Sequence, residues 1–308
     1  MEVRPLDEIL GTLDGEGCFE SLPFMPEMIP YCGKRLRIVK SAHKTCDPTG
    51  LTDLRRMKDA VHLEIRCDGS HHGGCQAGCL FFWKTAWLKQ PGSSQTNAAR
   101  LVCDEAALER ATRAGGEEAY RCQATEIVRA TTRLSPSAPM QYVRDIASRN
   151  ITLAEFLRRA PAIYLNGLKN KLMRWLGRAA SDERRVTQRP PLHLRPGEFV
   201  QIRPKEDIPE TLDREDRNLG LHFESDMRLS CGEVHRVVGR IERVIDERDG
   251  RMRQIRRDCI VLEGVSCRGL SSRHRLFCPR GALTFWREAW LERTEPGNAA
   301  AAEKKPVL

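Results

Sequence analysis

Cysteine and histidine side chains gather in one short stretch of this 308-residue chain. Cys67, Cys75 and Cys79 are spaced C-x7-C-x3-C, and His71 and His72 lie between the first two. Zinc prefers thiolate and imidazole ligands, usually four of them in a tetrahedron. The stretch is therefore a candidate metal site, although it lacks the C-x2-C pair that many zinc and iron–sulfur motifs contain.

Three thiols leave one position of a tetrahedral ion to be filled. Cys32 and Cys46 are the candidates for it in this half of the chain, with His72 or His43 as substitutes. Four more cysteines in the second half form a weaker candidate site. Together the predicted metal ligands are Cys32, Cys46, Cys67, His72, Cys75, Cys79, Cys231, Cys259, Cys267 and Cys278.

Three other roles for these cysteines stay open. Four thiolates can also hold an iron–sulfur cluster, but the absence of C-x2-C favours zinc. Cys75 or Cys79 could act as a nucleophile assisted by His72, although no third group that would orient the imidazole is identifiable. Cysteine is also a small apolar residue that is often simply buried.

The two cysteine sets occupy equivalent places in an internal repeat. Residues 4–39 match residues 203–238 without a gap, with fourteen identities in thirty-six positions. Further along, CQAGCLFFWKTAWLK pairs with CPRGALTFWREAWLE. The repeat sets Cys32, Cys67 and Cys75 opposite Cys231, Cys267 and Cys278. Three cysteines at matching places indicate a shared physical role, either metal binding or packing.

The repeat also divides the chain. The two copies span 1–90 and 196–295, and a different segment, 91–195, joins them. Residues 296–308 are rich in Ala, Lys and Glu, a composition typical of disorder. We therefore expect two cysteine-rich β modules, a helical linker and a disordered tail.

Within a copy, alternating apolar residues predict short strands. These are expected at 36–39, 199–202, 234–238 and 259–267. Asp249-Gly250 is a hairpin turn signal. If the strand at 259–267 has no bulge, Cys259 and Cys267 share one of its faces, because side chains alternate along a strand.

Each copy is expected to end in a helix. Trp83 and Trp87, like Trp286 and Trp290, are spaced i, i+4, which places both rings on one helix face. Pro279 precedes the second pair, and proline is favoured at the first position of a helix. The fold class expected is α+β, with two repeated small β-barrel-like modules, each ending in a helix.

Several motifs carry a resemblance that covers most of the chain. They are YCG at 31–33, AHKTC at 42–46, RCDGSHHGGCQAGC at 66–79, FWKTAWL at 82–88, YRCQATE at 120–126 and LFCPR at 276–280. With them the chain resembles a largely uncharacterised bacterial family that has a duplicated Cys-rich module of the SH3-like-barrel type. The resemblance implies two such modules but no activity.

The middle segment is predicted to be helical. Residues 104–114 are rich in helix formers, and Thr152 with Glu155 forms a capping box at the start of a second helix, which Pro161 should kink or divide. The cations of this second helix are Arg158, Arg159, Lys169, Lys171, Arg174 and Arg178. Such a helix can lie on an anionic membrane or a partner. The simpler expectation is that it covers the protein's own core.

Charge and hydropathy limit the setting. A formal charge of +9 permits nucleic acid as a partner, but there is no lysine tract or RGG motif to favour it. The sequence contains no run of 18 apolar residues, so we expect no membrane span. The start, MEVRPLDEIL, lacks the basic and apolar regions of a signal peptide. We expect a cytoplasmic protein, in which twelve cysteines stay reduced.

These features favour a metal-binding accessory or interaction protein, with zinc as cofactor and a protein as partner. The second hypothesis is a zinc or iron–sulfur metalloenzyme of a bacterial biosynthetic pathway, because Cys46, Cys79, His71 and His72 occur only in copy one. The third is a nucleic-acid-binding protein. No catalytic residue is identifiable, and nucleotide-binding and serine-hydrolase motifs are absent.

Overall fold

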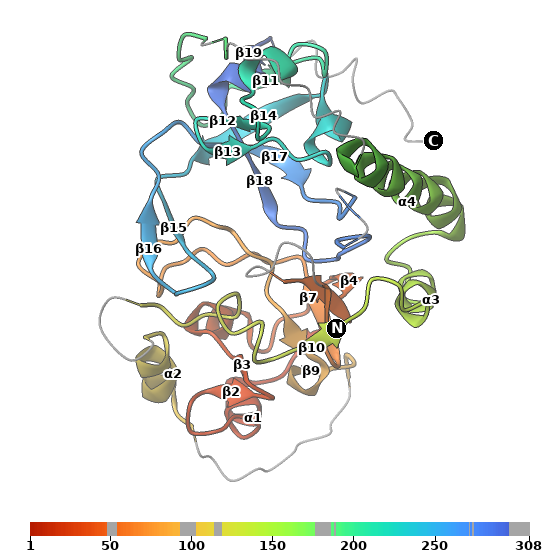
Figure 1. Cartoon of the computed structure of the whole chain (residues 1–308). Helices are drawn as coiled ribbons and strands as arrows, with labels where there is room; N and C mark the ends of the chain where they lie inside the picture. Colours follow the sequence, from red (N-terminus) through yellow and green to blue (C-terminus); the bar gives the residue numbers. More distant parts are fainter. Residues whose placement is uncertain are drawn as a thin grey trace.

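Short strands and a few helices make up the chain, as the predicted α+β class requires (Figure 1). The computed structural model describes residues 1–47, 54–92, 103–113, 119–175, 186–187, 189–270, 272 and 274–295, and the side chains of helix 153–175 up to residue 165. The tail at 296–308, which was expected to be disordered, lies outside the described residues.

The first half consists of short antiparallel strands around one core. Its elements are β1 (Glu2–Val3), α1 (Leu6–Leu10), β2 (Cys18–Phe19), β3 (Leu22–Pro23), β4 (Ile38–Ser41), β5 (Lys44–Cys46), β6 (Leu54–Arg56), β7 (Ala60–Leu63), β8 (Trp83–Lys84) and β9 (Leu88–Lys89), with 3-10 helices at Pro26–Tyr31 and Thr85–Trp87. Strands pair in the orders β4-β7-β8 and β1-β9. Phe24, Trp83 and Trp87 pack edge to face at its centre.

The second half carries the longest strands. Its elements are β11 (Phe199–Ile202), β12 (Arg217–Asn218), β13 (Leu221–His222), β14 (Val234–Arg240), β15 (Arg243–Ile245), β16 (Met252–Gln254), β17 (Ile260–Ser266), β18 (Leu283–Trp286) and β19 (Leu291–Arg293), with 3-10 helices at Pro209–Thr211, Met227–Ser230 and Glu288–Trp290. Five of them form an antiparallel sheet in the order β18-β17-β14-β11-β19. The strands predicted at 199–202 and 234–238 and the hairpin turn at Asp249-Gly250 are confirmed.

The prediction that each copy ends in a helix is wrong. In both copies a strand, one 3-10 turn and another strand replace it, because the backbone pairs with neighbouring strands: Val61 with Trp83 and Val3 with Leu88. The turn still directs both tryptophans into the core. Trp87 Nε1 donates to Thr12 Oγ1 at 3.1 Å, and the matching bond from Trp290 to Thr211 is 3.0 Å.

The strand predicted at 259–267 is present, but it contains a bulge. It appears as β17, whose register with β18 shifts between Val261 and Ser266, and Gly264 has a φ of +74°. Simple alternation therefore fails, and consecutive residues Ile260, Val261 and Leu262 are all buried. The bulge means that a shared face for Cys259 and Cys267 does not follow from their spacing.

The described residues of the segment between the halves form three helices and one strand. These are α2 (Glu105–Ala111), β10 (Thr132–Leu134), α3 (Met140–Ala147) and α4 (Leu153–Trp175). The predicted helix at 104–114 is confirmed as α2, whose cap is Asp104, and the predicted Thr152 cap of α4 accepts the Glu155 N–H at 3.1 Å. Pro161 was expected to kink or divide α4, and it does not divide the helix, which continues through it. None of the described helices has the length and apolar character that crossing a membrane requires.

The two halves are interlocked by their hairpins. The hairpin β15–β16 of the second half reaches the first half, where the Ile245 N–H donates to Cys75 Sγ, and its Arg251 bridges to Ala119 of the middle segment (Figure 1). In return, the Cys46 N–H at the end of β5 in the first half donates to Cys278 Sγ in the second at 3.1 Å. Strands β5 and β6 form a hairpin of the first half, and β10 of the middle segment pairs with β6. All three parts of the chain therefore meet at the β5–β6 hairpin.

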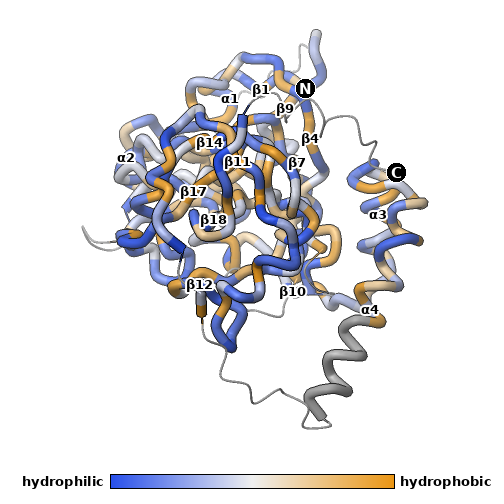
Figure 2. The backbone as a smooth tube through the Cα atoms, turned by 90° about the horizontal axis from the view of Figure 1, so that it is seen from above, coloured by the Kyte–Doolittle hydropathy of each residue, from blue (hydrophilic) through white to orange (hydrophobic). Residues whose placement is uncertain are grey.

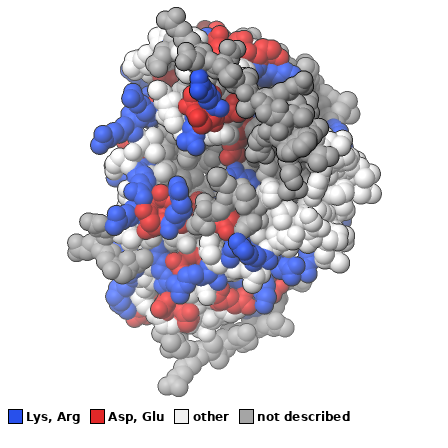
Figure 3. All heavy atoms as spheres, in the orientation of Figure 1, with Lys and Arg blue, Asp and Glu red and all other residues white. Residues whose placement is uncertain are grey.

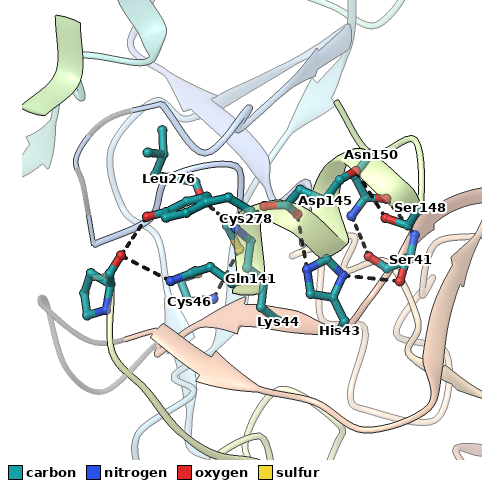
Figure 4. Close-up of polar contacts among 12 residues, drawn as sticks. Ser41, His43, Lys44, Cys46, Gln141, Asp145, Ser148, Asn150, Leu276 and Cys278 are labelled. Atoms are coloured by element: carbon teal, nitrogen blue, oxygen red, sulfur yellow. Dashed lines mark hydrogen bonds and ion pairs between the residues drawn. The ribbon is translucent and has the colours of Figure 1, made fainter. Parts of the chain in front are cut away.

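A buried lysine joins the same three parts (Figure 4). Lys44 of β5 has no exposed side-chain surface, and its ammonium lies 2.5 Å from Asp145 of α3 and donates to the Leu276 carbonyl at 2.9 Å. The Tyr142 ring lies 5.0 Å from the same nitrogen. Burial lowers the pKa of Lys44, and the Asp145 carboxylate opposes that shift. The pair therefore holds the helical segment and the second half on the first.

Replacing Lys44 by methionine should destabilise the protein strongly. The substitution leaves the Asp145 carboxylate buried without its ammonium partner, and such losses cost about 3–5 kcal/mol. The matched control is Arg37→Met, which breaks the exposed Arg37–Glu64 pair and should cost less than about 1 kcal/mol. Urea unfolding followed by tryptophan fluorescence measures both. Equal losses in the two variants would contradict this role of Lys44.

Candidate functional site

A small cavity at the boundary of the two halves is lined by thiols. Cys67, Cys75 and Cys79 of the first half and Cys122 of the middle segment surround a volume of about 40 Å³, together with Ile245 and Arg280 of the second half and apolar residues of the first. Almost all of its lining is carbon and sulfur. Sequence analysis proposed the first three cysteines but missed Cys122, which lies in the segment outside the repeat.

A tight loop brings the cysteines of the first half together. Gly69 has a φ of +70°, and a Cβ placed on it would lie 2.1 Å from the Cys75 carbonyl oxygen, so only glycine fits. The Cys67 N–H then donates to the Cys79 carbonyl at 2.8 Å, which closes the loop. Gly269 repeats this conformation in the second half, with a φ of +71° beside Cys278.

The hairpin of the second half covers this loop. The Ile245 N–H donates to Cys75 Sγ at 3.4 Å. Gln76 Oε1 accepts the N–H groups of Glu242 and Arg243 at 2.7 and 3.1 Å. The cavity is consequently complete only when both halves are in contact.

Gln123 positions Cys122 against the cavity. Its Oε1 accepts the Phe82 N–H at 2.8 Å, and its Nε2 donates to the carbonyls of Phe82 and Pro23, both at 3.0 Å. The side chain is buried, so these bonds replace the hydration that it loses. Cys122 is thereby held beside the loop although it is far from it in sequence.

Burial sets the protonation of the thiols. It raises the pKa of Cys79 to about 11 and that of Cys122 to about 12, and it raises the pKa of Cys67 further. Arg280 partly opposes the shift at Cys79. Without a cation in the cavity these cysteines are therefore neutral thiols near neutral pH.

His72, predicted as a metal ligand, is committed elsewhere. Its Nδ1 lies 2.6 Å from the buried Glu27 carboxylate and its Nε2 lies 3.0 Å from the Arg121 carbonyl. The Arg121 carbonyl accepts from Nε2 and Glu27 holds Nδ1, so neither ring nitrogen offers a free lone pair to a metal. His72 lines the cavity, but its side chain fastens the cysteine loop to Glu27 and is not available to an ion. His71 pairs with Glu109 on the surface.

Cys46 and Cys267 lie with Cys278, not with the first cluster. The neighbouring Cys278 side chain, helped by Arg280 and Arg275, lowers the pKa of Cys46. The same contact raises the pKa of Cys278 well above its usual range, and burial raises that of Cys267 to about 12. Cys46, the predicted fourth ligand, thus lies beside the cysteine loop of the second half, because the β5–β6 hairpin of the first half packs on that loop.

The remaining predicted ligands lie apart from both groups. Cys32 ends the 3-10 helix Pro26–Tyr31, Cys231 ends the 3-10 helix Met227–Ser230, and Cys259 packs in a small cluster with Ile241 and Val261. Burial raises the pKa of each to about 11. The structure therefore does not bring these three to the cavity.

All twelve cysteines are free thiols. Among the residues that the structure describes, no three His, Cys, Asp or Glu side chains already converge as ligands of one ion. A scan against protein-family models finds no match for this chain, and neither does a search of curated proteins. The predicted bacterial family and the zinc or iron–sulfur cofactor consequently stay predictions.

Basic and acidic side chains are interspersed on the face drawn in Figure 3. Ion pairs such as Arg253–Asp246 and Arg293–Glu198 neutralise part of the excess positive charge. Binding a nucleic-acid backbone requires a surface of uncompensated cations. The face in Figure 3 therefore does not favour the nucleic-acid hypothesis.

The metal-free protein should lose stability as the pH rises above 9. The folded state keeps protons on Cys79 and Cys122, which have pKa values of about 11 and 12, whereas the unfolded chain releases them near the ordinary value of 9.0. Their contribution is complete below pH 9 and is lost as the pH rises through 11 and 12. The free energy of unfolding at about pH 8 and about pH 10.5 tests this. Cys122→Ala should lose less stability between them, and a loss equal to that of the wild type would contradict the assignment.

Proposed function

We propose that this chain is a zinc-binding interaction protein built from two copies of one SH3-like module and working in a reducing cytoplasm. The ion would be held by Cys67, Cys75, Cys79 and Cys122. The observation that carries the proposal is that four thiols from two separate segments line one small cavity. Four sulfur ligands make a closed site with no position for water, which is typical of structural zinc.

The size of the cavity supports a single ion over an organic substrate. A volume of about 40 Å³ holds an ion or a few waters, whereas pockets for small organic ligands measure about 300–1,000 Å³. A cluster of several iron and sulfide atoms also needs more room than one ion. The size therefore favours a structural zinc over the metalloenzyme and iron–sulfur alternatives.

Binding would require the thiols to change in two ways. The sulfur atoms line the cavity without meeting at one point, so the side chains would turn about χ1 toward a common centre. They would also lose their protons, because zinc binds the thiolate. Since burial raises the pKa of Cys67, Cys79 and Cys122, zinc affinity should increase with pH, and each ion bound should release protons.

Anaerobic purification followed by elemental analysis and a visible spectrum tests the zinc site. We expect about one colourless zinc per chain, and at least about a tenfold loss of zinc affinity in Cys79→Ser and in Cys122→Ser. Cys32→Ser is the control, because Cys32 lies in the same half outside the cavity. Full zinc content in Cys122→Ser, or a loss of zinc in Cys32→Ser, would contradict the ligand set. A brown absorbance would replace zinc by an iron–sulfur cluster.

An exposed apolar stripe on α4 supports the interaction role. Phe156, Ala160 and Ile163 pack on Tyr142 and Phe277, as the expectation that α4 covers the core requires. On another face of the helix, however, Leu153, Leu157 and Leu165 are 56%, 61% and 65% exposed. Figure 2 shows α4 standing at the side of the molecule. With about 100° of turn per residue, these leucines spread over about 120° of the helix circumference and form a broad apolar stripe.

The positive charge of α4 indicates which kind of partner would bind the leucine stripe. The helix carries five cations (Arg158, Arg159, Lys169, Lys171 and Arg174) and one anion (Glu155), a net charge of +4. A second copy packed antiparallel on the leucine stripe would bring like charges together. We therefore propose an acidic amphipathic helix of another protein as the occupant.

A photo-crosslinking residue at position 157 tests the stripe in cells. We expect it to capture a protein that, once purified, binds the wild-type chain and binds Leu157→Glu at least about tenfold more weakly. Leu219 is the control, because it is 45% exposed on the turn between β12 and β13 in the second half. Equal capture at positions 157 and 219, or capture of a second copy only, would contradict the proposed occupant.

A further inference from the structure

The contact between Cys46 and Cys278 places two thiols side by side across the boundary of the halves. The Cys46 N–H donates to Cys278 Sγ at 3.1 Å, which brings the two residues into contact (Figure 4). Cys46 ends strand β5 and is half-buried, whereas Cys278 lies in the loop before β18 and is 3% exposed. Neither residue lines the thiol cavity.

The equivalent contact, from the hairpin of the second half to the cysteine loop of the first half, contains only one sulfur atom. There the Ile245 N–H at the end of β15 donates to Cys75 Sγ at 3.4 Å, so isoleucine takes the place that cysteine has at position 46. Both contacts join the end of a hairpin strand in one half to the cysteine loop of the other. A thiol pair is therefore specific to the Cys46 side.

Two arginines accompany this thiol pair. Arg280 Nη1 lies 3.9 Å from Cys46 Sγ, and Arg275 lies close enough to interact with Cys46 and Cys267. In the repeat these arginines stand where the first half has Ala77 and His72. Cations stabilise a thiolate, so these two arginines favour thiol chemistry at Cys46.

We propose that Cys46 and Cys278 are a redox-active dithiol, which hydrogen peroxide oxidises to a disulfide that joins the two halves. The Cys46 thiolate attacks one peroxide oxygen, the O–O bond breaks, and the leaving hydroxide takes a proton to become water. The Cys278 sulfur then attacks the Cys46 sulfenic acid, the S–O bond breaks, and the Cys278 proton leaves with the hydroxyl as a second water. Two thiols are oxidised and one peroxide is reduced. A dithiol reductant returns both cysteines by thiol–disulfide exchange.

The sequence allows this bond to be detected directly. Trypsin releases Cys46 in TCDPTGLTDLR and Cys278 in LFCPR, each with a single cysteine, while Cys267 leaves in a separate peptide. The purified full chain is treated with hydrogen peroxide, its remaining thiols are alkylated, and the unreduced digest is analysed by mass spectrometry. We expect the two peptides to appear joined, and to separate after dithiothreitol.

The controls make the outcome decisive. In Cys46→Ser the joined species must disappear, and in Cys278→Ser peroxide should leave Cys46 as a sulfenic acid that dimedone labels. Cys231 is the internal control, because it ends the 3-10 helix Met227–Ser230, apart from both thiol groups. Oxidised protein in which Cys46 and Cys278 are both alkylated, or in which Cys278 is joined to Cys267, would overturn the proposal. Zinc content, measured on the same samples, is independent of this result.

Discussion

The exchange of hairpins between the two halves is the constraint on which the rest of the structure depends. Each half contributes a glycine-closed cysteine loop, and each loop receives an N–H from the hairpin of the other half, at Cys75 and at Cys278. The Lys44–Asp145 pair then fixes the helical segment at the same boundary without any exposed charge. Neither the cavity nor the thiol pair is complete in one half alone.

The two equivalent loops carry different chemistry on the same backbone. Around Cys75 the cavity lining is almost entirely apolar although it includes Arg280, and Cys79 and Cys122 add two more sulfur atoms. Beside Cys278 the additions are Arg275 and Arg280, whose charges stabilise a thiolate. Neutral thiols in a dry cavity can be gathered by a cation, whereas a thiolate beside guanidinium groups can react. The same contact between a hairpin and a cysteine loop therefore suits metal binding at Cys75 and thiol oxidation at Cys278.

Local patterns in the sequence predicted the local structure. The strands at 199–202 and 234–238, the Asp249-Gly250 turn and helix α2 depend on neighbouring residues, and all were found. The helices expected around the tryptophan pairs were not. There, pairing with strands distant in sequence competes with the helix, and a spacing of four residues cannot reveal that competition. A sequence pattern likewise could not show that α4 continues through Pro161.

The candidate site was predictable only in part, for the same reason. Cys67, Cys75 and Cys79 lie in one loop, so their spacing indicated that they cluster. Cys122 reaches the cavity through the contacts of Gln123, and Cys46 leaves it because its hairpin packs on the other half. His72 looked like a ligand until Glu27 and Arg121 were found to occupy both of its nitrogens. Long-range contacts decided each of these cases.

X-ray absorption at the zinc edge of the purified full chain tests the central claim most directly. If the four thiols of the boundary cavity hold the ion, the first shell contains four sulfur atoms at about 2.3 Å and no light ligand. A shell with two or more nitrogen or oxygen atoms at about 2.0–2.1 Å would place the zinc elsewhere and contradict the account.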